Sequence, residues 1–135
     1  MYVEEVEYKI TNRGKIIEAG SVKPIPRDHE YYISLFPFDK TIIDFANING
    51  TVKGHEGKHG CSYILFDIDK DGDLEGARKD VLALISHLQS EYGLSPDDLY
   101  VWFSGSKGFH VAITERTYGK LEPSTDMAES IKRAA

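Results

Sequence analysis

The stretch "CSYILFDIDKDGDLEGARKDVLALISHLQSEYGLSPDDLYVWFSGSKGFHVAI", residues 61–113, decides the fold of this chain. An apolar, β-branched run is followed by apolar residues at helical spacing, and then by two apolar runs around a glycine- and serine-rich turn. Asp73 is placed to cap the helix, and Gly93 is placed to end it. The expected elements are a strand at 61–69, a helix at 74–92, and strands at 99–103 and 109–113. This order predicts an α/β (α+β) fold.

The flanking segments show weaker patterns. Strands are expected within 3–10 and 15–22, and a helix is expected to begin at Ser124 or Thr125. Residues 29–48 are rich in aromatic and β-branched residues but contain Pro37, and no element is assigned there. Residues 49–60 hold four glycines and are expected to form a turn and a mobile loop.

Length and composition fit one domain over residues 1–135. The single cysteine, Cys61, excludes an internal disulfide. No signal peptide is recognisable, and no apolar run approaches the roughly 20 residues of a membrane span, so we expect a cytoplasmic protein with no membrane partner. The net charge of −6 arises from residues 61–103, which carry 3 basic and 9 acidic groups. Concentrated carboxylates of this kind indicate either a metal site or a solvated acidic surface.

Two of these carboxylates share one face of a predicted strand. Asp67 and Asp69 flank Ile68, and side chains alternate along a strand, so both carboxylates project together. Paired carboxylates bind divalent cations, as in two-metal phosphoryl-transfer sites. The letters "DIDKDGD" also match the start of an EF-hand loop, but Arg78 stands where that loop needs a bidentate glutamate. A solvated acidic turn remains the alternative.

The turn "SGSKG" between the last two predicted strands offers groups that bind anions. Gly105 and Gly108 allow positive φ and a close approach of the backbone to a ligand. Exposed backbone N–H groups in such a turn form an anion-binding concavity. The side-chain donors around the turn are Ser104, Ser106, Lys107 and His110. A solvated hairpin, which favours the same glycines and serines, is the alternative.

The order "FDID", helix, strand, "SGSKGFHV" resembles the archaeo-eukaryotic primase superfamily. The likeness is to primase and primase-polymerase domains of phages, plasmids and CRISPR-associated systems, and the polymerase domains of bacterial end-joining ligases carry a similar SGSKGxH. The resemblance implies an RRM-like sheet, mixed or antiparallel, with helices packed on one face. It also implies that Asp67 and Asp69 are catalytic metal ligands for Mg²⁺ or Mn²⁺, and that Ser104 and His110 contact a nucleoside triphosphate. Lys107 would assist there.

The implied activity is template-directed nucleotidyl transfer, which makes or extends primers on single-stranded DNA from NTPs or dNTPs. A fused or associated helicase, replication or CRISPR protein would be its partner. The family has a third acidic residue on a later strand, which we expect beyond Ala135. We therefore expect this chain to be the N-terminal part of a catalytic domain. The alternative is a non-catalytic nucleotide- or nucleic-acid-binding module on the same fold.

Two other groups of residues have both a functional and a structural interpretation. His55, His59 and Cys61 could supply three zinc ligands, but no fourth ligand stands at a recognised spacing, so we expect a glycine-rich loop and no zinc. Trp102 could stack on a base, but its place in "LYVWF" favours the core.

Overall fold

The computed structural model describes residues 1–134, which fold into an α+β structure with two small antiparallel sheets. The chain groups into two compact units, and the second is inserted in the sequence of the first. Unit 1 comprises Met1–Ser62 and Leu121–Ala135, and unit 2 comprises Tyr63–Lys120. The single domain predicted for residues 1–135 stays a prediction, because two compact units can belong to one domain.

Unit 1 contains a three-stranded sheet in the order β2-β1-β3. Its strands are β1 (Tyr2–Glu7), β2 (Lys15–Glu18) and β3 (Tyr31–Ile33), and a 3-10 turn (Ala19–Ser21) follows β2. Its helices are α1 (Thr41–Asn49) and α4 (Met127–Ala134). The strands expected within 3–10 and 15–22 are confirmed. The helix expected from Ser124 or Thr125 is also present, but it begins two or three residues later.

Unit 1 contains a buried carboxylate whose counter-ion, Arg13, is partly exposed. Glu4 on β1 is buried, with only 3% of its side chain exposed, and its carboxylate accepts hydrogen bonds from Arg13 Nε at 2.9 Å and Nη2 at 2.6 Å. The backbone N–H of Gly14 donates a third bond at 2.8 Å. These donors compensate the loss of water around the carboxylate, which a buried charge requires. Gly14 has a φ of +92°, and a Cβ there would meet the Gly50 carbonyl oxygen.

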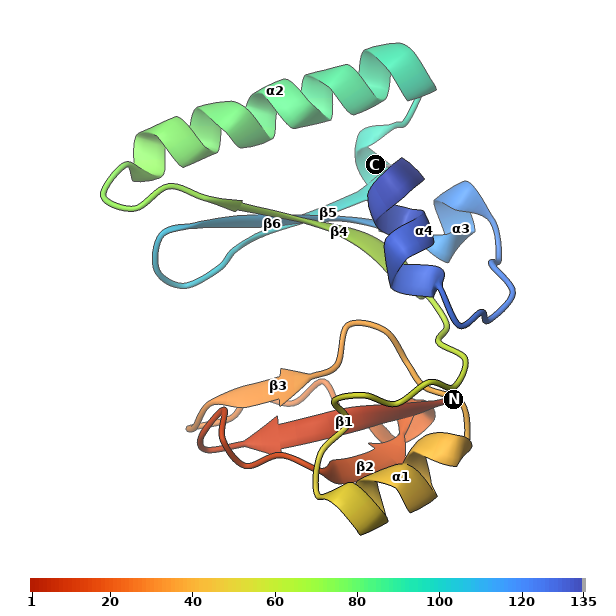
Figure 1. The fold of residues 1–135 in the computed structure, drawn as a ribbon. Helices are drawn as coiled ribbons and strands as arrows, with labels where there is room; N and C mark the ends of the chain where they lie inside the picture. Colours follow the sequence, from red (N-terminus) through yellow and green to blue (C-terminus); the bar gives the residue numbers. More distant parts are fainter. Residues whose placement is uncertain (135) are drawn as a thin grey trace. The chain divides into compact units, whose positions relative to one another are not determined.

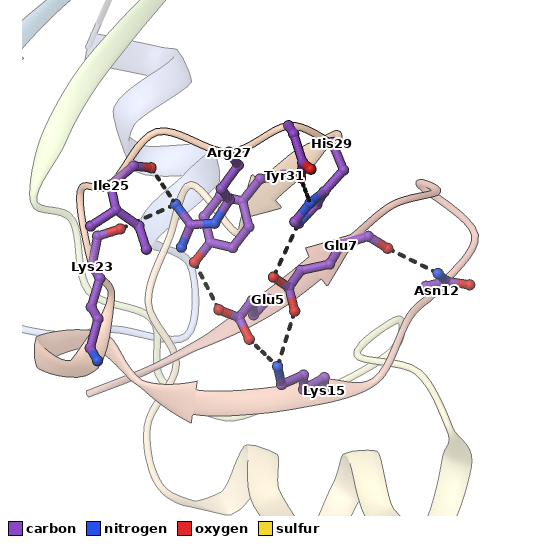
Figure 2. Close-up of polar contacts among 10 residues, drawn as sticks. Glu5, Glu7, Asn12, Lys15, Lys23, Ile25, Arg27, His29 and Tyr31 are labelled. Carbon is purple, nitrogen blue, oxygen red and sulfur yellow. Dashed lines mark hydrogen bonds and ion pairs between the residues drawn. The ribbon is translucent and has the colours of Figure 1, made fainter.

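A polar network covers another part of the same sheet (Figure 2). The Lys15 ammonium lies between the carboxylates of Glu5 and Glu7, and the Tyr31 hydroxyl donates to Glu5 at 2.9 Å. The Arg27 guanidinium stacks 3.4 Å above the Tyr31 ring centroid. Lys15 of β2 and Tyr31 of β3 are therefore paired with carboxylates of the central strand β1, and these contacts connect the three strands of the sheet.

Helix α1 lies largely within residues 29–48, where no helix or strand was predicted. Its cap comes from one residue further upstream than usual, because Asp39 Oδ1 accepts the backbone N–H of Thr41 at 3.0 Å. Ile42 and Ala46, one turn apart, are both buried, and Gly50 ends the helix with a φ of +66°. The β-branched and aromatic residues of this segment favour strands, so its short amphipathic helix was not predicted.

Unit 2 contains the second sheet, in the order β4-β6-β5, with every pair antiparallel. Helix α2 lies along one face of this sheet and packs against β4 and β6 (Figure 1). The strand, helix, strand, strand order predicted for residues 61–113 is confirmed. The elements are β4 (Tyr63–Asp69), α2 (Leu74–Tyr92), a 3-10 turn (Pro96–Asp98), β5 (Leu99–Phe103), β6 (Gly108–Thr114) and the short α3 (Glu115–Tyr118).

The caps of α2 are those that the sequence predicts. The Asp73 carboxylate accepts the backbone N–H of Gly76 at 2.9 Å, and Gly93 ends the helix with a φ of +66°. The helix buries Ala77, Val81 and Leu88, while Val111 of β6 is fully buried in unit 2. Side chains alternate along the strands, so His110 and Asp67 point to the sheet face opposite α2.

Strand β5 lies at the edge of its sheet and is exposed on both faces. Tyr100, Val101, Trp102 and Phe103 each keep between 43% and 57% of their surface accessible. The prediction that Trp102 lies in the core is wrong, because 43% of its surface stays accessible on this edge strand. Across residues 1–134, none of the helices combines the length and apolarity that crossing a bilayer needs.

Candidate metal and phosphate site

The register of the second sheet sets the geometry of the candidate site. Asp67 on β4 pairs with His110 on β6, and His110 pairs in turn with Trp102 on β5. The three side chains therefore form one row across the sheet, on the face opposite α2. Asp69 lies on the same face, two residues further along β4, and pairs with Gly108.

Asp67 and His110 are in contact. His110 Nε2 lies 3.2 Å from Asp67 Oδ1, and the Trp102 ring meets the imidazole edge-on at a centroid distance of 5.2 Å. The Asp67 side chain is 60% exposed, whereas that of His110 is 26% exposed. The imidazole is thus held between a carboxylate and an aromatic ring, while the carboxylate stays open to solvent and to cations.

Asp69 lies next to a positive charge from the serine-glycine turn. Lys107 Nζ is 3.8 Å from Asp69 Oδ2 and 3.3 Å from Asp71 Oδ1. The two aspartates, Asp71 above all, raise the pKa of Lys107 above its ordinary value, so the ammonium stays charged. The Lys107 carbonyl also accepts the backbone N–H of Lys70 at 3.1 Å, which ties this turn to the one after β4.

The two glycines of the turn have different roles. Gly105 has a φ of +99°, as predicted, and the backbone N–H of Ser104 closes the turn on the Gly108 carbonyl at 2.9 Å. Gly108 has no positive φ and is buried. A Cβ at position 108 would overlap the Ile68 carbonyl oxygen and the Asp69 carboxylate. The positive φ expected at Gly108 is therefore wrong, and the missing side chain lets β6 approach β4.

The structure brings the predicted site residues together as two pairs, Asp67 with His110 and Asp69 with Lys107. Ser104 and Ser106 lie in the same turn as Lys107, between β5 and β6. Within residues 1–134, no group of three or more His, Cys, Asp or Glu side chains is arranged to hold a metal ion. The third carboxylate expected beyond Ala135 falls outside the described residues.

Sequence reasoning missed two neighbours of the site. Asp71 contacts Lys107 more closely than Asp69 does, and Trp102 contacts His110. The position of Trp102 could have been derived, because a turn at 104–108 pairs Phe103 with Phe109 and so places residue 102 opposite residue 110. Asp71 gave no such signal, since it lies in the irregular turn after β4.

The three residues weighed as zinc ligands lie in unit 1. The His55 side chain is 4% exposed, and its Nε2 lies 2.8 Å from the Thr41 hydroxyl. The His55 and His59 rings meet edge-on at 5.8 Å, and both pack against the Phe38 ring. Cys61 is buried. The loop predicted to be mobile is thus packed through His55, and His59 forms β-bridges to Phe38 and Ser124.

Comparison with known proteins returned no relatives. No protein-family model matches the chain, and searches of curated proteins and of solved structures found no match either.

Proposed function

We propose that this chain carries the metal- and nucleotide-binding part of a template-directed nucleotidyltransferase of the archaeo-eukaryotic primase type. The observation that carries the proposal is the contact between Asp67 and His110, with Asp69 and Lys107 beside it on the same end of the sheet. Carboxylates that hold a cation and basic groups that hold an anion have to lie side by side if both are to act on one metal-bound triphosphate.

The arrangement of unit 2 supports this assignment. Its central strand β6 lies between β4 and β5, and one helix covers one face, which is compatible with the RRM-like sheet of the primase superfamily. The other face carries the candidate site. Fold alone does not define an activity, so the proposal depends on the residues on that face.

The donor set fits a hard divalent cation. Asp67 and Asp69 offer carboxylate oxygens from one strand face, with 60% and 35% of their side chains exposed. The ammonium of Lys107 already lies beside Asp69 as a positive counter-charge. Magnesium and manganese take much of their coordination from water and phosphate oxygens, so two protein carboxylates are a suitable anchor. When bound, such ions polarise the phosphoryl oxygens and stabilise the entering and leaving oxygens.

The residues of the turn would hold the triphosphate. Lys107 supplies a compact positive charge in the turn just before β6, and His110 on β6 supplies an imidazole N–H three residues further along the chain. Ser104 and Ser106 add hydroxyl donors next to them. In the proposed reaction, a primer 3′-oxygen bonds to the α-phosphorus while the bond to the pyrophosphate oxygen breaks, and pyrophosphate leaves. The residues of this chain orient the triphosphate for that displacement.

Primer synthesis tests the proposal. A form of the protein that includes the third acidic residue expected after Ala135 is incubated with a single-stranded DNA template, nucleotides and Mn²⁺, and labelled products are separated by length. We expect synthesis that is lost in Asp67→Ala and kept in Asp97→Asn. Asp97 is a suitable control because it is an exposed aspartate of unit 2 that precedes β5, at the sheet end remote from Asp69.

Calorimetric titrations with Mn²⁺ and with nucleotide, together with the synthesis assay, distinguish three outcomes. Synthesis that survives Asp67→Ala refutes metal catalysis at this site. Binding that depends on Asp67 and His110 without any synthesis identifies the chain as a non-catalytic nucleotide-binding module. Binding that is indifferent to both residues overturns the proposed site altogether.

A further inference from the structure

The sheet face that carries Asp67 and His110 also contains a hollow, further along the strands. Its volume is about 350 Å³, at the lower end of the roughly 300–1,000 Å³ of small-molecule sites. The residues that line it are Tyr63, Tyr100, Trp102, Ala112 and Thr114. All five belong to unit 2, and all five lie on the face opposite α2.

The hollow has a simple cause in the strand register. Ala112 lies at the centre of the sheet and pairs with Tyr100 on β5, while Trp102 occupies the next position along that strand face. A methyl group between large rings leaves an empty space above it. Tyr63, paired with Thr114, bounds the far end. The floor is therefore flat and apolar, and the walls are aromatic.

The lining points to one kind of occupant. None of the lining residues is charged, so the part of a ligand that enters is neutral. Trp102 and Tyr100 remain 43% and 57% exposed, which leaves ring surface available for stacking. Aromatic side chains on an exposed strand face stack on nucleobases, and the phenol and threonine hydroxyls can bond to the polar edge of a base.

The hollow is continuous with the proposed phosphate site. Trp102 forms one of its walls and also contacts His110 edge-on at 5.2 Å. Ala112 and Thr114 follow His110 on the same strand face, about 7 and 13 Å further along at the usual strand rise. That separation matches the reach from the terminal phosphates of an extended nucleoside triphosphate to its base.

We propose that this hollow binds the base of the nucleoside triphosphate whose phosphates lie at Lys107 and His110. The proposal rests on the proposed function, because it assigns the second half of the same ligand. It gives Tyr100 and Trp102 the role of stacking surfaces. Ligand binding would then explain why these two rings are exposed on an edge strand.

The test compares ATP with inorganic tripolyphosphate at the same Mg²⁺ concentration, by calorimetry on the full chain. We expect ATP to bind more tightly than tripolyphosphate. Trp102→Ala and Tyr100→Ala are expected to weaken ATP binding by about 5- to 150-fold, which is the range for loss of one stacking partner. The affinity of Tyr100→Ala for tripolyphosphate is expected to stay unchanged, which also shows that this variant is folded.

Two further variants sharpen the comparison. Trp102→Phe keeps a ring and is expected to restore most of the affinity for ATP. Tyr92→Ala removes a more exposed ring at the end of α2, outside the hollow, and is expected to leave both affinities unchanged. In the unmodified chain, Trp102 is the only tryptophan, so its fluorescence should be quenched by ATP and not by tripolyphosphate.

The outcomes separate this proposal from the proposed function. Equal affinities for ATP and tripolyphosphate, both lost in His110→Ala, overturn the base site and leave the phosphate site intact. Absence of binding by both ligands overturns the proposed function, and the base site with it. Quenching of Trp102 by oligothymidylate but not by ATP assigns the hollow to a template base and overturns the nucleotide as its occupant.

Discussion

Asp67 and His110 face each other in direct register on β4 and β6, with Oδ1 and Nε2 3.2 Å apart. If both groups act on one metal-bound triphosphate, their contributions to binding are coupled. A double-mutant cycle measures this coupling through nucleotide affinity. Asp67→Asn and His110→Ala should each weaken binding, and the double variant should lose less binding free energy than the sum of the two single losses. We expect a coupling energy of about 0.5–3 kcal/mol. Additive effects would show that the two residues act separately, and the cycle of Asp97→Asn with His110→Ala should be additive.

Lys107 should affect metal and nucleotide binding in opposite directions. Its ammonium lies 3.8 Å from Asp69 and competes with a cation at that carboxylate. Lys107→Ala is therefore expected to strengthen binding of Mn²⁺ alone by up to about fivefold, the range of an exposed ion pair. The same change is expected to weaken tripolyphosphate binding by about tenfold or more, because a charged hydrogen bond to phosphate is lost. Lys79→Ala on α2 is the control. If Lys107→Ala changed the affinities for Mn²⁺ and for tripolyphosphate in the same direction, competition between Lys107 and the cation would be contradicted.

Gly108 should be intolerant of any side chain. A Cβ there would overlap the Ile68 carbonyl, and neither backbone can move without breaking the β4–β6 pairing. Gly108→Ala is expected to lower the free energy of unfolding of unit 2 by about 1–3 kcal/mol. Urea unfolding followed by Trp102 fluorescence measures this change. Gly20→Ala is the control, because a Cβ there meets nothing within 4 Å.

The ion pair between the buried Glu4 and the partly exposed Arg13 should dominate the electrostatics of unit 1. Arg13→Ala leaves a carboxylate with 3% exposure without its counter-ion, and should destabilise unit 1 by on the order of 3 kcal/mol. Lys15→Ala removes a more exposed charge and should cost less than about 1 kcal/mol. Hydrogen exchange of peptides within residues 1–62 measures the loss of stability in each of the two variants. Equal effects would show that burial of Glu4 does not matter.

The same pair should make unit 1 sensitive to acid. Burial alone would raise the pKa of Glu4, but the hydrogen bonds from Arg13 and the Gly14 N–H outweigh it and lower that pKa. The unfolded carboxyl therefore binds a proton more readily than the folded one. The stabilisation is present above the ordinary glutamate pKa of about 4.3 and is lost as the pH falls through the lowered value. Acid unfolding of Arg13→Ala should show a weaker dependence on pH in this range.

His59 should add a second acid-sensitive step at higher pH. Burial lowers the pKa of His59, and the neighbouring His55 lowers it further. Stability is therefore complete above the ordinary histidine value of about 6.5 and falls as the pH drops through the lowered pKa. His59→Phe keeps a ring against Phe38 and should remove this step. Unfolding measured between pH 7 and 5 checks it, and an unchanged profile in His59→Phe would assign the step to another group.

The sequence predicted unit 2 better than unit 1, for physical reasons. Helix α2 has a side-chain cap at Asp73, a left-handed glycine at 93 and a long apolar period, so local signals agree with the fold. Helix α1 lacks such agreement, because its residues favour strands and its cap, Asp39, lies one position early. Gly50 was the one local signal that agreed with the fold, because it indicates the C-terminal end of α1.

The candidate site was predictable as a set of residues and not as a set of contacts. Alternation placed Asp67, Asp69 and His110 on one face, and the register confirms that arrangement. Alternation does not say whether a face is covered, which is why Trp102 was expected in the core. Contacts made through irregular turns, such as Lys107 with Asp71, depend on backbone geometry that no periodicity encodes.

The division of the chain into two units also bears on how the protein is made. Unit 2 is one continuous segment, 63–120, whereas unit 1 needs residues from both sides of it. The backbones of His59 and Ser124 pair within unit 1 through hydrogen bonds of 2.8 and 3.0 Å. During synthesis, the sheet of unit 2 can therefore be complete before the ribosome has released the last part of unit 1. The segment translated first is the one whose folding finishes last, which reverses the usual order from the N-terminus.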